Sequence, residues 1–343
     1  MCRHEVSIAD IARIAGVSHT TVSRALRESP LISSETRERI QLLAGDMGYT
    51  PNAIAQSLQT KQTSTIGLVV TSIADPFFGD VVKGVEEVAR ASDFSVLLSA
   101  SYNDPEQTLD IIETFHRRRV DGILVASSRI SDNYSCRLRH THIPTVLINS
   151  RVEGQGNLLH WISVDDCQGA QIAVDHLVQL GHRAIGYLGS NSRPASNLQR
   201  HQGYHNALRA AGIEPSPSWV VTSPGNEASQ EEDISAGQNG LSQLLEAGVT
   251  AVFCYNDMTA IGMLASCRAR GIDVPQDLSI IGFDDITIAS CVTPPLTTIH
   301  QPRVELGRLA TQVILDLLQN RSGVNHTLCP TLVLRTSTAP LSV

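Results

Sequence analysis

From residue 65 onward, short apolar segments alternate with helix-like segments, and this alternation limits the folds open to the chain more than any other feature. The apolar segments are nearly continuous, which is typical of strands buried on both faces of a parallel sheet. The rest of the 343-residue chain is long enough for two such α/β lobes. The expected strands are 65–71, 94–99, 122–126, 145–149, 162–164, 185–189, 251–255 and 278–282. The expected helices between them are 78–91, 105–118, 167–180, 200–211, 237–247 and 258–270.

The first 50 residues follow a different pattern. Ser7, with Asp10 three residues later, has the spacing of a capping box at the start of a helix. Gly16 then supplies a turn, and Ser18 is a good N-cap for a second short helix. Two short helices joined by a glycine-containing turn predict a helix-turn-helix, whose second helix can lie in the major groove of DNA. An ordinary helical hairpin is the alternative interpretation.

A third helix is expected after Ser33, and Gly48 stands where a C-terminal glycine would end it. Beyond it, Pro51 suits the first turn of another short helix that reaches Leu58, and a polar run follows at once. This segment has two possible interpretations. It is either a plain tether between domains or a hinge helix that orders against DNA and inserts Leu58 into the minor groove.

Charge is unevenly distributed along the chain. The net charge is −8, but residues 1–62 carry seven basic and six acidic side chains, which leaves −9 on the remainder. A slightly basic head on an acidic body suits a small DNA-contacting module joined to a regulatory body. It argues against a protein that coats nucleic acid generally. The composition, 42% hydrophobic and 17% charged, is that of a globular protein.

Several other classes lack their signals. No transmembrane span or secretory signal is recognisable, so we expect a cytoplasmic protein. The seven cysteines include no CxxC pair, which indicates neither a zinc site nor a disulfide framework. There is no GxSxG or P-loop, so neither an enzyme nor a cofactor is expected. His201 and His205 could in principle share a metal ion, but no wider metal motif surrounds them, and we expect no metal site.

Motifs along nearly the whole chain, in the right order, resemble those of the LacI family of bacterial repressors. In the head they are SIADIA at 7–12, AGVS at 15–18, TVSRAL at 21–26 and GYTPN at 48–52. In the body they are DPFF at 75–78, VDG at 120–122, LGH at 180–182, ND at 256–257, GFDD at 282–285 and PPLTTI at 294–299.

The resemblance implies a helix-turn-helix head over residues 1–50 and a hinge helix with linker over 51–64. It also implies a two-lobed α/β body of parallel sheets over 65–343, like a type I periplasmic binding protein. Its N-lobe would take residues 65–163 plus 299–327, and its C-lobe 164–298 plus 328–343. The family works as homodimers on operator DNA, and the lack of a heptad tail after the body favours a dimer over a tetramer.

The family's DNA contacts transfer onto the head residue by residue. Base reading falls on His19, Thr20 and Arg24. Arg24 can contact guanine through two hydrogen bonds, while the other two form the variable pair that sets operator choice. Backbone-contacting or orienting positions are Ser18, Thr21, Ser23, Ser33, Thr36, Tyr49 and Asn52. The minor-groove hinge positions are Ala55 and Leu58. Arg27 replaces a usual asparagine and is either an extra phosphate contact or a solvated charge.

The family's effector pocket lies between the lobes, at the carboxyl ends of the strands. The pocket positions fall on Phe77, Phe78, Asp165, Ser196, Arg200, Asn256, Asp284 and Gln301, with Asn149 and Trp161 as further candidates. The two phenylalanines could instead be plain core. Residues 222–236 are expected to form a long polar loop that departs from the family pattern.

The expected protein is therefore a repressor controlled by a small molecule, with a sugar or sugar derivative as the expected effector. A nucleobase- or nucleoside-responsive repressor is one alternative. A sugar-binding protein without a transcriptional role is an alternative of a different class, although it would not need a DNA-binding head.

Overall fold

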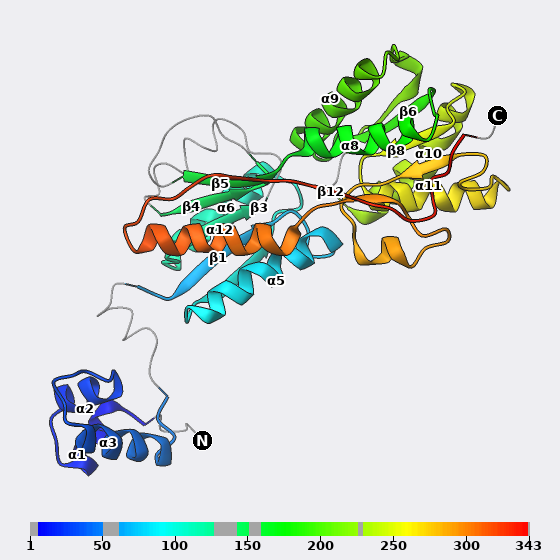
Figure 1. The fold of residues 1–343 in the computed structure, drawn as a ribbon. Coiled ribbons are helices and arrows are strands. Elements are labelled where there is room, and N and C mark those ends of the chain that lie inside the picture. Colours follow the sequence, from blue (N-terminus) through cyan, green and yellow to red (C-terminus); the bar gives the residue numbers. More distant parts are fainter. Residues whose placement is uncertain (1–5, 51–61, 127–142, 151–158, 226–228, 342–343) are drawn as a thin grey trace. The chain divides into compact units, whose positions relative to one another are not determined.

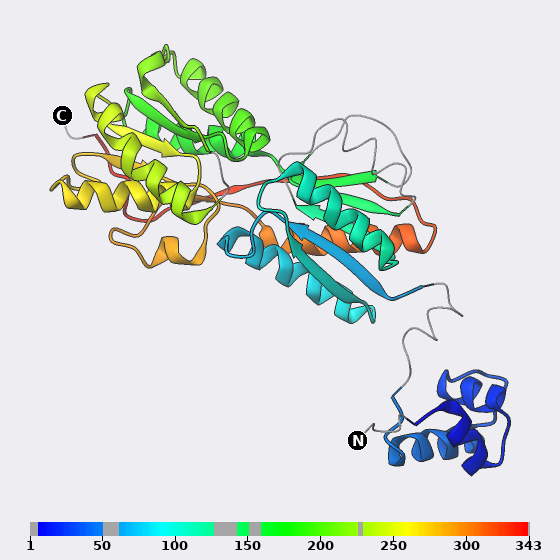
Figure 2. The same ribbon diagram turned by 180° about the vertical axis from the view of Figure 1, so that it is seen from behind.

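The computed structural model describes residues 6–50, 62–126, 143–150, 159–225 and 229–341 (Figure 1, Figure 2). The chain divides into two compact units, Met1–Thr63 and Ser64–Val343. The expected backbone-contacting Asn52 and the expected hinge positions Ala55 and Leu58 lie outside the described residues. Within the described part of the chain, no helix is long and apolar enough to cross a membrane.

In the described residues of the first unit, three helices are present: α1 (Ile8–Ala15), α2 (His19–Leu26) and α3 (Ser34–Asp46). Each begins at a serine cap. The Ser7 hydroxyl accepts from the Asp10 N–H, and the Asp10 carboxylate accepts from the Ser7 N–H in return, so the capping box is present. Ser18 and Ser33 cap α2 and α3 through their hydroxyls, which accept from the N–H groups of Thr21 and Thr36. These observations confirm the expected helix starts and the helix-turn-helix connection.

The core of this unit is small and made of short side chains. One residue pair from each helix is buried in it: Ile11, Ala12, Val22, Ala25, Ile40 and Ala44. Gly16 and Gly48 adopt left-handed backbone with φ of 66° and 67°, which allows the sharp exits from α1 and α3. The turn is tied to α3 by Arg39, which donates to the Ala15 carbonyl at 3.1 Å.

The second unit begins with a six-stranded parallel sheet whose order is β11-β5-β4-β3-β1-β2. Its strands are β1 (Thr65–Val70), β2 (Ser95–Ala100), β3 (Gly122–Ala126), β4 (Thr145–Ile148), β5 (Leu159–Val164) and β11 (His326–Leu328). The helices of its described residues are α5 (Pro76–Ala91), α6 (Pro105–Arg117) and α12 (Arg303–Leu318). We call this sheet with α5, α6 and α12 the N-lobe.

The two faces of the N-lobe sheet are covered differently. Side chains of α5 and α12 form one apolar core with Leu68, Leu124 and Val146, while α6 closes the opposite face against Ile123. α5 and α12 cross at glycines, where their backbones touch. A Cβ atom added at Gly84 would lie 2.0 Å from a carbonyl oxygen of α12.

The C-lobe contains a four-stranded parallel sheet of order β7-β6-β8-β9 and four helices (Figure 1). Its strands are β6 (Ile185–Ser190), β7 (Val220–Ser223), β8 (Ala251–Cys254) and β9 (Ser279–Ile281). Its helices are α8 (Asp166–Gln179), α9 (Pro194–Ala210), α10 (Gln230–Glu246) and α11 (Asp257–Ala269). Helices α8 and α9 pack on one face around Tyr187 and Phe253, and α10 and α11 on the other around Leu188 and Val252. The predicted two-lobed α/β body is confirmed.

The chain passes between the lobes three times: after β5, between β10 (Thr298–His300) and α12, and between β11 and β12 (Thr331–Val333). β10 and β12 pair antiparallel, and neither was expected from the sequence. The C-terminal segment returns to the C-lobe, where the Ser337 hydroxyl donates to the Ile280 carbonyl at 2.6 Å. Two short 3-10 helices, η1 (Pro217–Trp219) and η2 (Thr287–Ser290), complete the C-lobe.

The expected polar loop over 222–236 is wrong. β7 occupies residues up to Ser223, and α10 begins at Gln230 rather than near residue 237. The Ser229 hydroxyl caps this helix by accepting from the Glu232 N–H at 3.1 Å. Three acidic residues follow in the first turn, where the helix dipole favours negative charge. The polarity of the segment therefore reflects a helix start rather than a loop.

Candidate functional site

The candidate DNA-contacting surface is the outer face of α2. His19, Thr20 and Arg24 are exposed, while Val22 and Ala25 on the same helix are fully buried. The helix thus turns three predicted base-reading side chains to solvent and anchors itself through its opposite side. A short exposed helix that follows a tight turn is what entry into a major groove requires.

The predicted backbone-contacting residues surround the starts of α2 and α3. The Ser18 and Thr21 hydroxyls lie 2.9 Å apart, and Ser33 donates to the Thr36 hydroxyl over the same distance. Helix N-termini with free N–H groups and hydroxyls are suited to binding phosphate. Tyr49 packs partly against the small core.

Arg27, where the resemblance left two interpretations open, folds back along its own helix. Its guanidinium donates to the Ser23 carbonyl at 3.0 Å and to the Ser23 hydroxyl at 2.9 Å. Ser23, a predicted backbone-contacting residue, is therefore coupled to Arg27, because it already receives hydrogen bonds from the Arg27 guanidinium.

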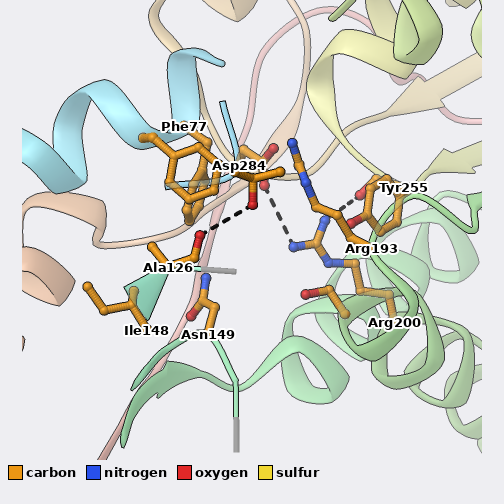
Figure 3. Close-up of a pocket in the computed structure, with 11 residues that line it drawn as sticks. Phe77, Ala126, Ile148, Asn149, Arg193, Arg200, Tyr255 and Asp284 are labelled. Carbon is orange, nitrogen blue, oxygen red and sulfur yellow. Dashed lines mark hydrogen bonds and ion pairs between the residues drawn. The ribbon is translucent and has the colours of Figure 1, made fainter. Parts of the chain in front are cut away.

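The body contains a pocket between the two lobes, at the carboxyl ends of their strands (Figure 3). The N-lobe wall is formed by Thr71, Phe77, Phe78, Ala126, Ile148 and Asn149. The C-lobe wall is formed by Arg193, Ser196, Arg200, Tyr255 and Asp284. The cavity volume is about 30 Å³, which accommodates about two waters but not a sugar. A larger ligand therefore requires the lobes or the lining side chains to move.

The aromatic part of the N-lobe wall is positioned by the start of α5. Asp75 caps this helix by accepting from the Phe77 N–H at 2.9 Å, and Pro76 occupies its first turn. The Phe77 and Phe78 rings meet edge to face, with centroids 5.2 Å apart. Both side chains belong to the N-lobe core and also line the pocket, so the two interpretations of these residues are compatible.

Arg200 organises the C-lobe wall. Its guanidinium donates to Asp166 at 2.9 Å and to the Tyr255 carbonyl at 2.5 Å, and lies 3.7 Å from the Asp284 carboxylate. It also stacks 3.7 Å above the Phe283 ring. Burial alone would lower the pKa of Arg200, but the two carboxylates raise it above its usual value. Arg200 therefore stays charged at any physiological pH.

Asp284 is held in an unusual backbone conformation with φ of 120°. Its carboxylate accepts from the Gln301 amide at 2.6 Å. Burial raises the pKa of Asp284 to about 6, against the opposing pull of Arg200 and Arg193. This carboxylate can therefore change its charge near neutral pH and can accept hydrogen bonds from a ligand when ionised.

Several bonds join the lobes around the pocket. Arg193 forms an ion pair with Asp75 across the cleft, and both side chains are about nine-tenths buried. On the same side, the Asn103 amide donates to the Ser192 carbonyl at 2.6 Å. At the crossing into α12, Arg303 donates to the Asp285 carbonyl of the C-lobe at 2.9 Å. These contacts hold the two lobes together around the pocket.

Five of the eight predicted effector positions line the pocket: Phe77, Phe78, Ser196, Arg200 and Asp284. The other three lie elsewhere. Asp165 caps α8, Asn256 caps α11, and Gln301 bonds Asp284 from behind. Asn149 lines the pocket, whereas Trp161 packs on the α6 side of the sheet.

Sequence reasoning missed Asp75, Asp166, Arg193 and Tyr255. Asp75 was within the recognised DPFF motif, so its position was available as a signal. Asp166 begins α8, Arg193 directly precedes α9, and Tyr255 directly follows β8. Nothing in the local sequence distinguishes these three residues from ordinary polar residues.

The two histidines considered for a metal ion do approach each other. Their Nε2 atoms lie 3.0 Å apart on α9, and burial lowers the pKa of both rings. Within the described residues, no three His, Cys, Asp or Glu side chains are placed to hold a metal ion together.

Comparison with known proteins matches both units of the chain. Residues 7–52 match the bacterial regulatory proteins of the lacI family, and residues 174–338 match a periplasmic binding protein-like domain. The HTH-type transcriptional regulator GalS of Salmonella typhimurium is 37% identical over 338 residues, covering 97% of each chain. GalR of Escherichia coli is 37% identical over 341 residues, covering 98% of this chain and 97% of that one. The chain belongs to the LacI family.

Solved structures agree with this assignment. The lac repressor dimer bound to operator and the anti-inducer ONPF superposes with a TM-score of 0.86 at 28% identity, covering 98% of this chain and 99% of the other. The complex of the transcriptional regulator CelR with cellobiose gives 0.72 at 27% identity, covering 97% and 100%. As a LacI-family member, the protein is a DNA-binding transcriptional regulator. Its partners are those of the family: operator DNA, a small-molecule effector and a second copy of the chain.

Proposed function

We propose that this LacI-family protein is a repressor that binds a near-palindromic operator as a homodimer and is controlled by a neutral sugar. Residues 1–50 act as the DNA-reading head, 51–64 as hinge and linker, and 65–343 as the effector-binding and dimerisation body. The N-lobe takes 65–163 plus 299–327, and the C-lobe 164–298 plus 328–343. The protein acts in the cytoplasm, where the operator lies, and has no catalytic step.

The proposed operator contact rests on the exposed face of α2. Arg24 would contact a guanine, and His19 with Thr20 would read the neighbouring bases. Ser18, Thr21, Ser23, Ser33, Thr36, Tyr49 and Asn52 would hold the head on the phosphates. Ala55 and Leu58 would enter the minor groove.

The base-reading assignment is tested on an operator selected from random duplexes by the full-length protein. Arg24→Ala should weaken operator binding by about 1–3 kcal/mol and relax preference at one base pair of each half-site. Arg27→Ala is the matched control, because its guanidinium is already bonded to Ser23, and it should keep the base preference. An Arg24→Ala protein that selects the same sequence with the same affinity would refute the assignment.

One observation carries the choice of a neutral sugar: both arginines of the pocket are already paired with carboxylates of the protein. Arg200 lies against Asp166 and Asp284, and Arg193 against Asp75. A phosphorylated ligand would need a free cation. A ligand with several hydroxyl groups can instead donate to the carboxylates and accept from the guanidinium edges while it rests on an apolar wall.

The effector is tested by measuring the melting temperature of the protein with neutral sugars, sugar phosphates and nucleobases, because a ligand of the folded state raises it. We expect neutral sugars to stabilise the protein and to change operator affinity. Stabilisation by a nucleobase or nucleoside alone would support the alternative effector class. Stabilisation by sugar phosphates alone would contradict the charge argument.

The proposed control mechanism needs two arrangements of the lobes. An effector that favours one arrangement changes the separation of the two hinge segments in the dimer, and a coupling of about 1–3 kcal/mol is typical. The lobe-spanning bonds of Arg193 and Asn103 are the contacts that such a change would break or remake.

A further inference from the structure

The body carries a cluster of positive charge outside the pocket. α6 ends at Arg117, and Arg118 and Arg119 follow directly, which makes the longest run of basic residues in the sequence. We call these three residues the arginine triplet. All three side chains are exposed, in a body whose net charge is strongly negative.

The backbone under the triplet is unfavourable for an arginine. Arg119 adopts left-handed backbone with φ of 56°, a conformation that costs a residue with a long side chain of the order of 1 kcal/mol. The equivalent position after the other body helices holds residues that tolerate it: Asp93, Gly181, Gly212, Gly248, Gly271 and Asn320. A glycine at position 119 would avoid this backbone cost.

Arg117 and Arg118 differ from other arginines of the N-lobe in their electrostatic partners. Arg303 and Arg308 are bound to Asp80 and Glu87. Arg117 donates to the Thr114 hydroxyl at 2.9 Å, and no carboxylate in the described ranges forms an ion pair with Arg117 or Arg118.

The triplet lies at the edge of the N-lobe sheet that the amino ends of its strands form, where the chain enters the body from the head. Two residues after it, the Asp121 carboxylate accepts from the Thr65 N–H at 3.2 Å, and the Asp121 N–H donates to the Thr65 carbonyl at 2.8 Å. Figure 2 shows α6, in teal, ending beside the start of β1. The 51–63 segment that joins this edge to the DNA-reading head spans at most about 45 Å when fully extended.

We propose that the arginine triplet binds phosphates of the duplex beside the operator half-site, as a second contact that does not read sequence. This inference rests on the DNA-binding function of the head. Guanidinium groups pair with phosphate oxygens through two hydrogen bonds, and neutralised phosphates release counterions.

The test is the salt dependence of DNA affinity for the full-length triple variant R117Q/R118Q/R119Q. The protein's affinity for the selected operator and for a mixed-sequence duplex is measured at several salt concentrations between about 0.05 and 0.3 M. Over roughly this range the loss of phosphate contacts changes the affinity measurably. The slope of log K against log salt should fall by about 0.9 for each lost contact, and affinity at 0.1 M salt by up to about eightfold per contact. Both duplexes should be affected equally.

The matched control is R183Q/R209Q/R268Q, which removes the same charge from exposed arginines of the C-lobe. It should keep the wild-type slope. Equal slope changes in both variants would show that only net charge matters and would overturn the proposal. Loss of operator affinity with an unchanged slope would also overturn it, because the triplet would then act on the protein rather than on phosphates. Failure to select any operator would instead refute the proposed function, and the mixed-sequence duplex would still test the triplet.

A single substitution separates folding from binding. Arg119→Gly removes the backbone strain and one guanidinium together, so the melting temperature should rise while affinity for both duplexes falls. An Arg119→Gly protein with wild-type DNA affinity would remove Arg119 from the contact.

Discussion

The N-lobe wall of the pocket presents Phe77, Phe78 and Ile148, whereas the C-lobe wall presents Arg200 and Asp284. The first wall is held by the packing of a hydrophobic core, and the second by buried ion pairs. A change of shape in a hydrophobic core usually costs little stability when the side-chain volume is kept. Loss of one member of a buried ion-pair network is strongly destabilising, because it leaves a charge buried without its partner. The difference indicates that the C-lobe wall sets ligand orientation and the N-lobe wall sets ligand fit.

The largest effect is expected when the C-lobe wall loses its central cation. Arg200→Met leaves Asp166 and Asp284 buried without their partner, which should cost about 3–5 kcal/mol of unfolding free energy and abolish effector binding. Chemical denaturation and calorimetry measure both. Arg209→Met, on the exposed side of the same helix, should change neither. A loss below about 1 kcal/mol for Arg200→Met would show that the two walls are not held differently.

The ion pair that bridges the two walls should give the next largest effect. Asp75→Asn keeps an acceptor for the cap of α5 but leaves Arg193 without its carboxylate, at a cost of about 2–3 kcal/mol. The cleft should open more readily, which hydrogen exchange of the pocket strands would detect as faster exchange. Unchanged exchange would mean that the bridging pair does not hold the walls together.

The charge of Asp284 makes the C-lobe wall sensitive to pH. Its pKa of about 6 is above the ordinary value of about 3.9, so between these values the folded state holds a proton that the unfolded chain has released. The contribution of Asp284 to stability therefore declines as the pH rises through about 6. Effector affinity should show the opposite trend and fall by up to tenfold per pH unit below about 6, because protonation removes an acceptor. Calorimetric titration of the effector between about pH 5 and 8, a range that brackets the pKa of Asp284, measures this change in affinity.

Asp284→Asn is the control for the pH effect. It should bind the effector weakly but with little pH dependence across the same range. A variant that keeps the wild-type pH profile would assign the effect to another group.

The smallest effect is expected on the N-lobe wall. Phe78→Leu keeps an apolar side chain of similar volume, so the loss of stability should stay below about 1.5 kcal/mol. Effector affinity should fall modestly, and the order of preference among sugars should change more than the affinity itself. A loss as large as that of Arg200→Met would break the comparison between the walls.

Much of the fold followed from local sequence. The caps at Ser7, Ser18 and Ser33 depend on residues three positions away, so the sequence alone located the starts of α1, α2 and α3. The start of α10 was missed because its acidic first turn has the same composition as a loop. β10 and β12 were missed because each has three residues, and their pairing joins distant parts of the chain.

The pocket was harder to predict because two sheets build it jointly. Phe77 and Asp284 stand in recognisable motifs, but Arg193 and Tyr255 reach the pocket only through the juxtaposition of loops from different strands. Gln301 lies behind the wall that it supports, since it binds Asp284 rather than the cavity. Motifs therefore indicated that a site exists, and the tertiary structure showed which side chains face it.

The three passages of the chain between the lobes have a consequence for synthesis on the ribosome. The N-lobe sheet begins with β1 but receives β11 and the covering helix α12 only after the C-lobe has been made as far as β10. Until then, apolar side chains such as Leu124 and Val146 have no cover from α12. A chain that terminates shortly after β10 would release a C-lobe without β12 and its C-terminal segment, attached to an uncovered sheet. Premature termination there would produce a substrate for chaperones and proteases rather than a partly active regulator.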